Sequence, residues 1–152
     1  MSLNRLSQAA FTEFIGAVVE EVNEGVCRLT LRVEPRHLDR RGVLHTGVIT
    51  SLVDATIGIG LGYLRREEIG RRPHATIEMS TSFLAEARLG DEIEAEGRVI
   101  RAGKSIAFGE AVARRRPDGE LLALSRLTFA IPAHRRSTNV AQGPSPEAGP
   151  SP

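Results

Sequence analysis

Hydrophobic positions in the middle of the chain predict one long helix, from about Thr46 to Leu64. Its apolar residues point in every direction around a helical wheel, which is typical of a helix that is buried on most of its sides. Asp54 is the only charged residue in this stretch. An ionised carboxylate is costly to bury without a partner, so we expect Asp54 to have a specific role.

Glycines interrupt this helix at four positions, Gly47, Gly58, Gly60 and Gly62. Each glycine weakens a helix by about 1 kcal/mol relative to alanine. Their presence indicates either fraying near Gly60 or the close approach of another backbone, with packing supplying the lost stability.

Alternating and apolar-rich runs on either side of the helix predict strands. Residues 14–22 and 26–33 are separated by a short polar turn, as in a β-hairpin. Four further strands are expected after the helix, at residues 75–84, 91–102, 105–115 and 120–131. Short links between these runs favour antiparallel pairing.

This order of elements predicts an α+β fold in which an antiparallel sheet of five to six strands wraps around one long central helix. Such a sheet covers only part of the helix, so we expect a second subunit to cover the rest. Residues 1–12 form an N-terminal segment in this interpretation, with a short helix over residues 3–12, and residues 13–133 form the domain. Residues 134–152 are rich in Pro, Gly and Ser, which predicts a disordered tail.

Composition narrows the classes of function. The chain has 152 residues, of which 20 are basic and 19 acidic, and a net charge of +1 gives no field that favours nucleic acid or an anionic membrane. Lys104 is the only lysine. The arginine guanidinium suits phosphate, so local phosphate binding stays open, beside the alternative that the arginine bias reflects the base composition of the gene.

Location in the cell follows from three features. The central helix has about the length of a bilayer span, but Asp54, the four glycines and arginine pairs on both sides argue against a membrane helix. The N-terminus lacks the pattern of a signal peptide. Cys27 is the only cysteine, which excludes an intrachain disulfide and fits a reducing compartment. We therefore expect a cytoplasmic protein.

The start of the helix carries a motif. The segment from Asp39 to Gly47, DRRGVLHTG, continues through Leu52, Val53 and Asp54. It resembles the N-x-x-G-x-x-H-G-G-x-x-x-x-L-x-D signature of the hotdog-fold acyl-CoA thioesterases of the PaaI-like group. The chain departs from this signature at Asp39, where the family usually has Asn, and at Thr46, where it has the first Gly.

Later segments fit the same family. The run ATIEMSTSFL at residues 75–84, followed by ARLGD at residues 87–91, is similar to its next strand and turn. The segment Gly103-Lys104-Ser105 and the strand that ends at Phe129 also fit. The resemblance spans residues 12–132 and implies a sheet wrapped around the helix, in dimers that commonly pair into tetramers.

The resemblance also implies a reaction and its residues. The reaction is hydrolysis of an acyl-CoA thioester, without a metal and with coenzyme A only as part of the substrate. Asp54 would be the catalytic carboxylate, which either attacks the thioester carbonyl or acts as a base on water. The backbone N–H of Thr46 would point at the carbonyl oxygen. Thr76, contributed by the facing subunit, would hold the attacking water or the thioester.

Physical chemistry is consistent with these roles. A helix N-terminus presents unpaired N–H groups and a partial positive charge, which suit an oxyanion on a thioester carbonyl. Asp54 lies eight residues after Thr46, about two turns along the helix, so both can face one groove. The alternative for Asp54 is a structural carboxylate that accepts hydrogen bonds across a dimer.

A wider set of residues is expected to contact the substrate: Asp39, His45, Gly47, Arg88, Lys104 and Ser105. For His45 the alternative is a side chain that only ties down the preceding loop. For Arg88 and Lys104 the choice lies between coenzyme A phosphates and solvated surface charge. His37, His74 and His134 have no spacing that indicates a metal site.

Two other functions compete with hydrolysis. One is a non-catalytic hotdog protein that binds acyl-CoA or has a regulatory role. The departures from the signature at Asp39 and Thr46 make this function possible. The other is a hotdog dehydratase, whose paired His and acidic motifs do not occur in this sequence.

Overall fold

The chain folds as one long helix packed against one sheet. The computed structural model describes residues 10–66 and 73–132. Its elements are α1 (Ala10–Phe14), β1 (Val18–Asn23), β2 (Val26–Arg32), the short 3-10 helix η2 (Pro35–His37), α2 (Thr46–Leu64), β3 (Ala75–Phe83), β4 (Glu92–Ala102), β5 (Ile106–Arg116) and β6 (Leu121–Ala130).

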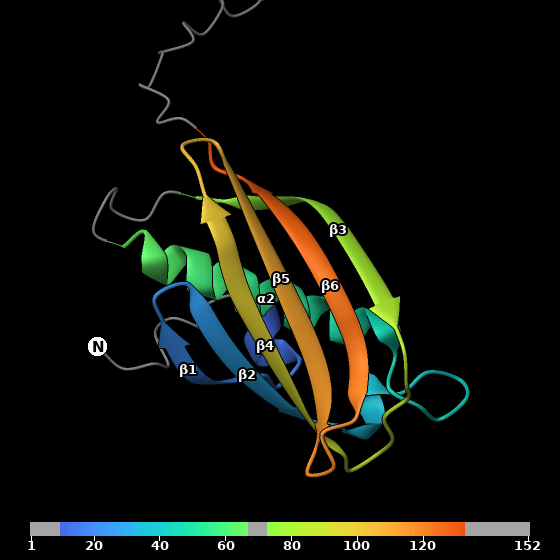
Figure 1. The fold of residues 1–152 in the computed structure, drawn as a ribbon. Coiled ribbons are helices and arrows are strands. Elements are labelled where there is room, and N and C mark those ends of the chain that lie inside the picture. Colours follow the sequence, from blue (N-terminus) through green and yellow to red (C-terminus); the bar gives the residue numbers. More distant parts are fainter. Residues whose placement is uncertain (1–9, 67–72, 133–152) are drawn as a thin grey trace, which may run out of the picture.

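The six strands form a single antiparallel sheet in the order β1-β2-β4-β5-β6-β3. The sheet curves around α2, which lies along one of its faces (Figure 1). The predicted α+β fold is therefore confirmed. β1 and β3 are the two edge strands. β3 comes directly after α2 in the chain, but in the sheet its neighbour is β6, the last strand.

The predicted elements at the two ends of the chain have different outcomes. The described residues include a short helix, α1, over Ala10–Phe14, which overlaps the helix predicted over residues 3–12 only at residues 10–12. The first strand begins later than expected, at Val18. Residues 1–9 and the predicted disordered tail, 134–152, lie outside the described residues. Disorder of the tail stays a prediction.

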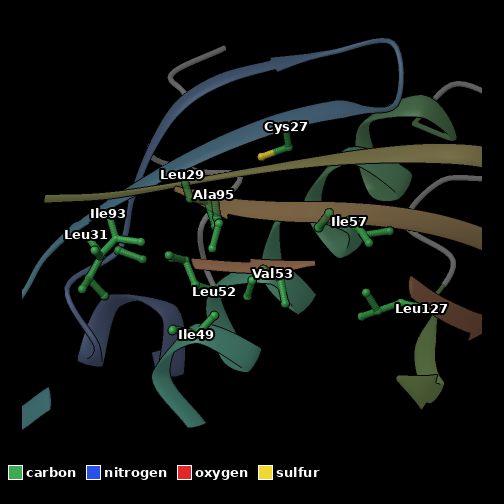
Figure 2. Close-up of a cluster of buried hydrophobic side chains, with 14 of the residues drawn as sticks. Cys27, Leu29, Leu31, Ile49, Leu52, Val53, Ile57, Ile93, Ala95 and Leu127 are labelled. Carbon is green, nitrogen blue, oxygen red and sulfur yellow. The ribbon is translucent and has the colours of Figure 1, made fainter. Parts of the chain in front are cut away.

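The core lies between α2 and the inner face of the sheet. Apolar side chains from one side of α2 are buried there: Ile49, Leu52, Val53, Ile57 and Leu61. They meet inward-facing side chains of β2 and β4, among them Leu29, Leu31, Ile93 and Ala95 (Figure 2). By length and composition α2 is the one helix in residues 10–66 and 73–132 that could cross a membrane. Here it is the core helix of the sheet.

Glycines in the sheet let the helix approach closely. A Cβ atom on Gly97 of β4 would lie 2.2 Å from Oγ1 of Thr56, and one on Gly109 of β5 would lie 2.5 Å from Cγ2 of Ile57. At Gly60 of α2, a Cβ atom would lie 3.0 Å from the backbone oxygen of Gly25, in the turn between β1 and β2. The close backbone approach expected from the sequence is confirmed at Gly60.

The other side of α2 is only partly covered by its own chain. Thr46 and Gly62 are exposed, and Asp54 and Gly58 are half-buried. We call this side, which carries Gly47, Asp54, Gly58 and Gly62, the open side of α2. A second subunit that covers it stays a prediction.

Candidate active site

Asp54 and Thr76 meet on the open side of α2. The Thr76 hydroxyl, near the start of β3, donates a hydrogen bond of 2.5 Å to Oδ1 of Asp54. Both side chains are half-buried and belong to the same chain. The expectation that Thr76 arrives from a facing subunit is therefore wrong. The reason is the curvature of the sheet, which brings the edge strand β3, paired with β6 at Thr76 and Phe129, over the helix of its own chain.

His45 begins the helix as its N-cap. Its Nδ1 accepts a hydrogen bond of 2.8 Å from the backbone N–H of Gly47, and its own N–H donates to the carbonyl oxygen of His37 at 2.8 Å. A Cβ atom on Gly47 would lie 2.9 Å from Nδ1 of His45, so this cap needs glycine at position 47. His45 therefore has a structural role, because its side chain satisfies a helix N–H and its backbone N–H holds the preceding loop. Contact of His45 or Gly47 with substrate stays a prediction.

Thr46 keeps the backbone donor that the motif requires. Among the described residues only Glu24 is a non-glycine residue with positive φ, so threonine at position 46 is not strained. None of the residues in the described part of the chain accepts a hydrogen bond from its N–H, as is usual in the first turn of a helix. The Thr46 side chain is exposed. The N–H is thus available to a ligand.

Thr46 and Asp54 of one helix are too far apart to act on one carbonyl. Eight residues at a rise of 1.5 Å put them about 12 Å apart along the helix axis. A hydrogen bond to the carbonyl oxygen and an attack on the same carbonyl each require contact at about 3 Å. The expectation that both face one groove of a single chain therefore does not give a complete site.

Asp39 holds its own loop together. Its Oδ1 accepts hydrogen bonds from the backbone N–H of Arg41 at 2.8 Å and of Val43 at 3.4 Å, and its Oδ2 pairs with the Arg41 guanidinium at 3.0 Å. Arg41 also reaches Glu86 at 2.7 Å. Partial burial opposes the ionisation of Asp39, but the hydrogen bonds from Arg41 and Val43 outweigh it, so the pKa of Asp39 lies below its ordinary value. Arg41 offsets the resulting charge.

Arg88 and Lys104 lie at opposite ends of β4. Arg88 precedes this strand of 11 residues, and Lys104 and Ser105 follow it. A strand of that length spans roughly 35 Å, so one nucleotide cannot contact both ends of a single chain. Arg88 lies at the end of the sheet where α2 begins, because the N–H of Leu44 donates to the carbonyl oxygen of Ala87 at 2.8 Å.

Lys104 and Ser105 belong to the other end of α2. The guanidinium of Arg65, directly after the helix, donates to the carbonyl oxygen of Gly103 at 2.7 Å. The structure thus divides the predicted phosphate contacts into two separate groups.

Sequence reasoning missed two residues near this site. Arg41, which holds Asp39, left no signal beyond its place in an arginine-rich loop. His74 lies against Gly58 of α2, four residues after Asp54, with its ring centroid 5.7 Å from that of Phe129. A signal for His74 did exist, since residues two apart in an extended chain share a face and Thr76 was already a candidate.

A hollow of about 560 Å³ lies on the outer face of the sheet, away from α2. Ser80, Ser82, Glu96, Arg98 and Arg126 are among its lining residues, and none of the predicted site residues lines it. Among residues 10–66 and 73–132, no group of three or more His, Cys, Asp or Glu side chains is placed to hold a metal ion. The candidate site is therefore the Asp54 and Thr76 pair.

Comparison with known proteins gives matches over most of the domain. The sequence model of the thioesterase superfamily matches residues 41–122. Mouse acyl-coenzyme A thioesterase 13 is 28% identical over 98 residues, which cover 64% of this chain and 67% of that protein. The chain spans about two thirds of the length of the first curated relatives that it matches.

Solved structures match the whole sheet and helix. The zebrafish thioesterase superfamily member 2 has a TM-score of 0.76 at 22% identity, over 87% of this chain and 99% of that one. The Escherichia coli PaaI protein from the phenylacetic acid degradation operon has a TM-score of 0.75 at 18% identity, over 87% and 97%. These likenesses establish the hotdog fold.

Proposed function

The chain belongs to the thioesterase superfamily, and we propose that it is an acyl-CoA thioesterase, which hydrolyses a thioester to the free acid and coenzyme A. The name of the mouse relative supports this class of substrate. The observation that carries the proposal is the Asp54 carboxylate on the open side of α2, bound by the Thr76 hydroxyl at 2.5 Å.

Asp54 is the reacting carboxylate in this proposal. The Thr76 hydroxyl occupies Oδ1 of Asp54 and leaves Oδ2 for chemistry. In the base route, Asp54 takes a proton from water, the water oxygen bonds to the carbonyl carbon, and the carbon–sulfur bond breaks. In the nucleophile route, Asp54 itself bonds to the carbonyl carbon and water later hydrolyses the anhydride. In both routes the thiolate leaves with little need of a proton.

Thr46 supplies the oxyanion donor from a second copy of the chain. Because Thr46 and Asp54 of one helix are about 12 Å apart, a thioester held by Asp54 and Thr76 needs the helix start of another copy at its carbonyl oxygen. The proposed unit is therefore a homodimer, which pairs further into a tetramer. One backbone donor of this kind is worth roughly 10²–10³ in turnover.

Asp54→Asn tests the proposal. A panel of aryl, short and medium acyl-CoA thioesters is incubated with each protein, and release of free thiol is followed. We expect kcat to fall by about 10²–10⁴, because a positioned carboxylate contributes that much, while Tm changes little. Asp118→Asn, in the turn between β5 and β6, removes the same charge far from α2 and should keep full turnover.

Two results would redirect the proposal. Equal turnover by Asp54→Asn and the wild type would remove Asp54 from the mechanism. Tight binding of acyl-CoA with no turnover across the panel would favour the acyl-CoA-binding protein instead. Label in the Asp54 carboxylate after a single turnover in ¹⁸O-labelled water would establish the nucleophile route, with water attacking the Asp54 carbonyl carbon of the anhydride. Label in the free acid alone fits the base route and also attack of water on the acyl carbon of the anhydride.

A further inference from the structure

His74 occupies the open side of α2, next to Asp54. Its Nε2 lies 3.5 Å from the place that a Cβ atom on Gly58 would take, and its Cε1 lies 3.6 Å from that place on Gly62. Helix residues four apart are neighbours, with Cβ positions about 5–6 Å apart. The imidazole therefore lies across the open side just beyond Asp54, toward the end of the helix.

The ring is held in this place by the sheet. His74 comes directly before β3, two residues before the Thr76 that binds Asp54. Its ring meets that of Phe129 edge-on, at 5.7 Å and 68°. Phe129 is only 2% exposed and pairs with Thr76 in the sheet. The half-buried His74 is thus part of the same wall that positions Thr76.

Gly58 and Gly62 are not required by the packing of this chain. A Cβ atom at either position would make an ordinary van der Waals contact with His74, whereas one on Gly60 would press on the Gly25 backbone at 3.0 Å. Glycine within a helix is destabilising, so packing within the chain gives Gly58 and Gly62 no compensation. What these glycines do is leave the helix backbone bare against the imidazole, with room for one methyl group at each position.

The two directions away from Asp54 differ in polarity. Toward the helix start, the hydroxyls of Thr50 and Ser51 donate to the carbonyl oxygen of Gly47 at 2.9 and 2.8 Å. Toward the helix end, the next residues on this side are Gly58 and Gly62, which have no side chains, with the imidazole of His74 against them. A thioester of coenzyme A has an amide-containing arm on one side of its carbonyl and an acyl group on the other. The less polar direction suits the acyl group.

We propose that His74 forms the end wall of the acyl-binding space beside Asp54 and limits the protein to short acyl groups. This inference rests on the proposed function, since it takes Asp54 as the place where the thioester carbonyl is held. His74 acts here by shape, as a specificity-determining residue.

The experiment compares the wild type with His74→Ala on a straight-chain series from acetyl-CoA to dodecanoyl-CoA. Wild-type kcat/KM should drop sharply beyond a short length. For the first excluded length the variant should gain about tenfold or more, because one methylene in an apolar pocket is worth about that factor. For acetyl-CoA the two proteins should be equal.

Two glycine variants make the matched control. Gly58→Ala adds a methyl group between Asp54 and His74 and should lower kcat/KM for the longest accepted acyl group. Gly62→Ala adds the same group on the far side of the ring and should leave the length profile unchanged. Both should unfold at a higher Tm than the wild type, because alanine favours the helix, so they test the inference even where His74→Ala does not fold.

Binding of stable 2-oxoalkyl-CoA analogues of the same lengths, measured by calorimetry, separates this inference from the proposed function. Suppose that no thioester is hydrolysed, but that the analogues show the same length limit and His74→Ala binds longer analogues. The proposed function is then refuted, and the role of His74 as the end wall is supported. An unchanged length profile in His74→Ala overturns the end wall. So does an equal loss at every length, which would make His74 catalytic or structural.

Discussion

The two sides of α2 differ in how far contacts within the chain explain their residues. On the buried side, Leu52, Ile57 and Leu61 are at most 1% exposed, and each has a packing partner in the same chain. On the open side, Asp54 has a single-chain partner in Thr76, but Gly58 and Gly62 have none that requires them. A buried position can therefore be explained from one chain. An open position can be explained only by what binds there.

The largest effect on stability is expected at Ile57, on the buried side. Its side chain fills the space that Gly97 and Gly109 leave in β4 and β5. Ile57→Ala leaves a cavity there and should lower the free energy of unfolding by about 2–5 kcal/mol, measured by urea denaturation. Turnover per folded molecule should stay near the wild-type value, because Ile57 does not face Asp54.

Leu89→Ala is the control for this prediction. Leu89 is 56% exposed, so truncating an aliphatic side chain of the same size here should shift the unfolding free energy by about 0.5 kcal/mol or less. If Ile57→Ala instead reduced turnover as strongly as Asp54→Asn does, the separation between the two sides of the helix would fail.

A smaller effect, on turnover, is expected at Thr76. Thr76→Val removes the hydroxyl that donates to Asp54 and keeps the β-branched shape. We expect kcat to fall about tenfold, which corresponds to about 1.4 kcal/mol, because Asp54 loses its orientation. The half-exposed carboxylate can turn to water, so Tm should change little. Thr76→Ser, which keeps the hydroxyl, should restore most of kcat. A loss of Tm with no loss of kcat would make the hydrogen bond structural.

The features that the sequence could predict are those that depend on residues close together in the chain. The sequence predicts the helix from Thr46 to Leu64, where the structure has it, because its apolar run has clear limits. Strand positions followed from alternation, and Asp54 was conspicuous as the one charge in an apolar run. These signals are local in the chain.

Other features of the site depend on contacts distant in the sequence. Thr76 reaches Asp54 of its own chain only because β3 joins the sheet beside β6 and curls over the helix. His74 depends on the same curl. The pairing of Asp39 with Arg41 requires a tight turn, closed by a hydrogen bond of 2.8 Å from the N–H of Asp39 to the carbonyl oxygen of Val43. Periodicity carries no information about such turns.

The smallest effect is expected at Asp39, which lies in the loop that leads into the helix. Its pKa in the folded protein is below the ordinary value of 3.8, because the hydrogen bonds from Arg41 and Val43 outweigh its partial burial. Its contribution to stability is therefore complete above about pH 4, where the unfolded chain is also ionised, and is lost as the pH falls through the folded pKa. Asp39→Asn removes this dependence.

The Tm of Asp39→Asn and that of the wild type should therefore differ by a constant amount between pH 7 and pH 5, and the gap should close below pH 4. Since Arg41 already offsets the charge of Asp39, we expect no gain in turnover from Asp39→Asn at neutral pH. A large gain would show that the Asp39 carboxylate repels the oxyanion. Asp39 would then belong with Asp54 among the residues that face the substrate, and the loop before the helix would be part of the site.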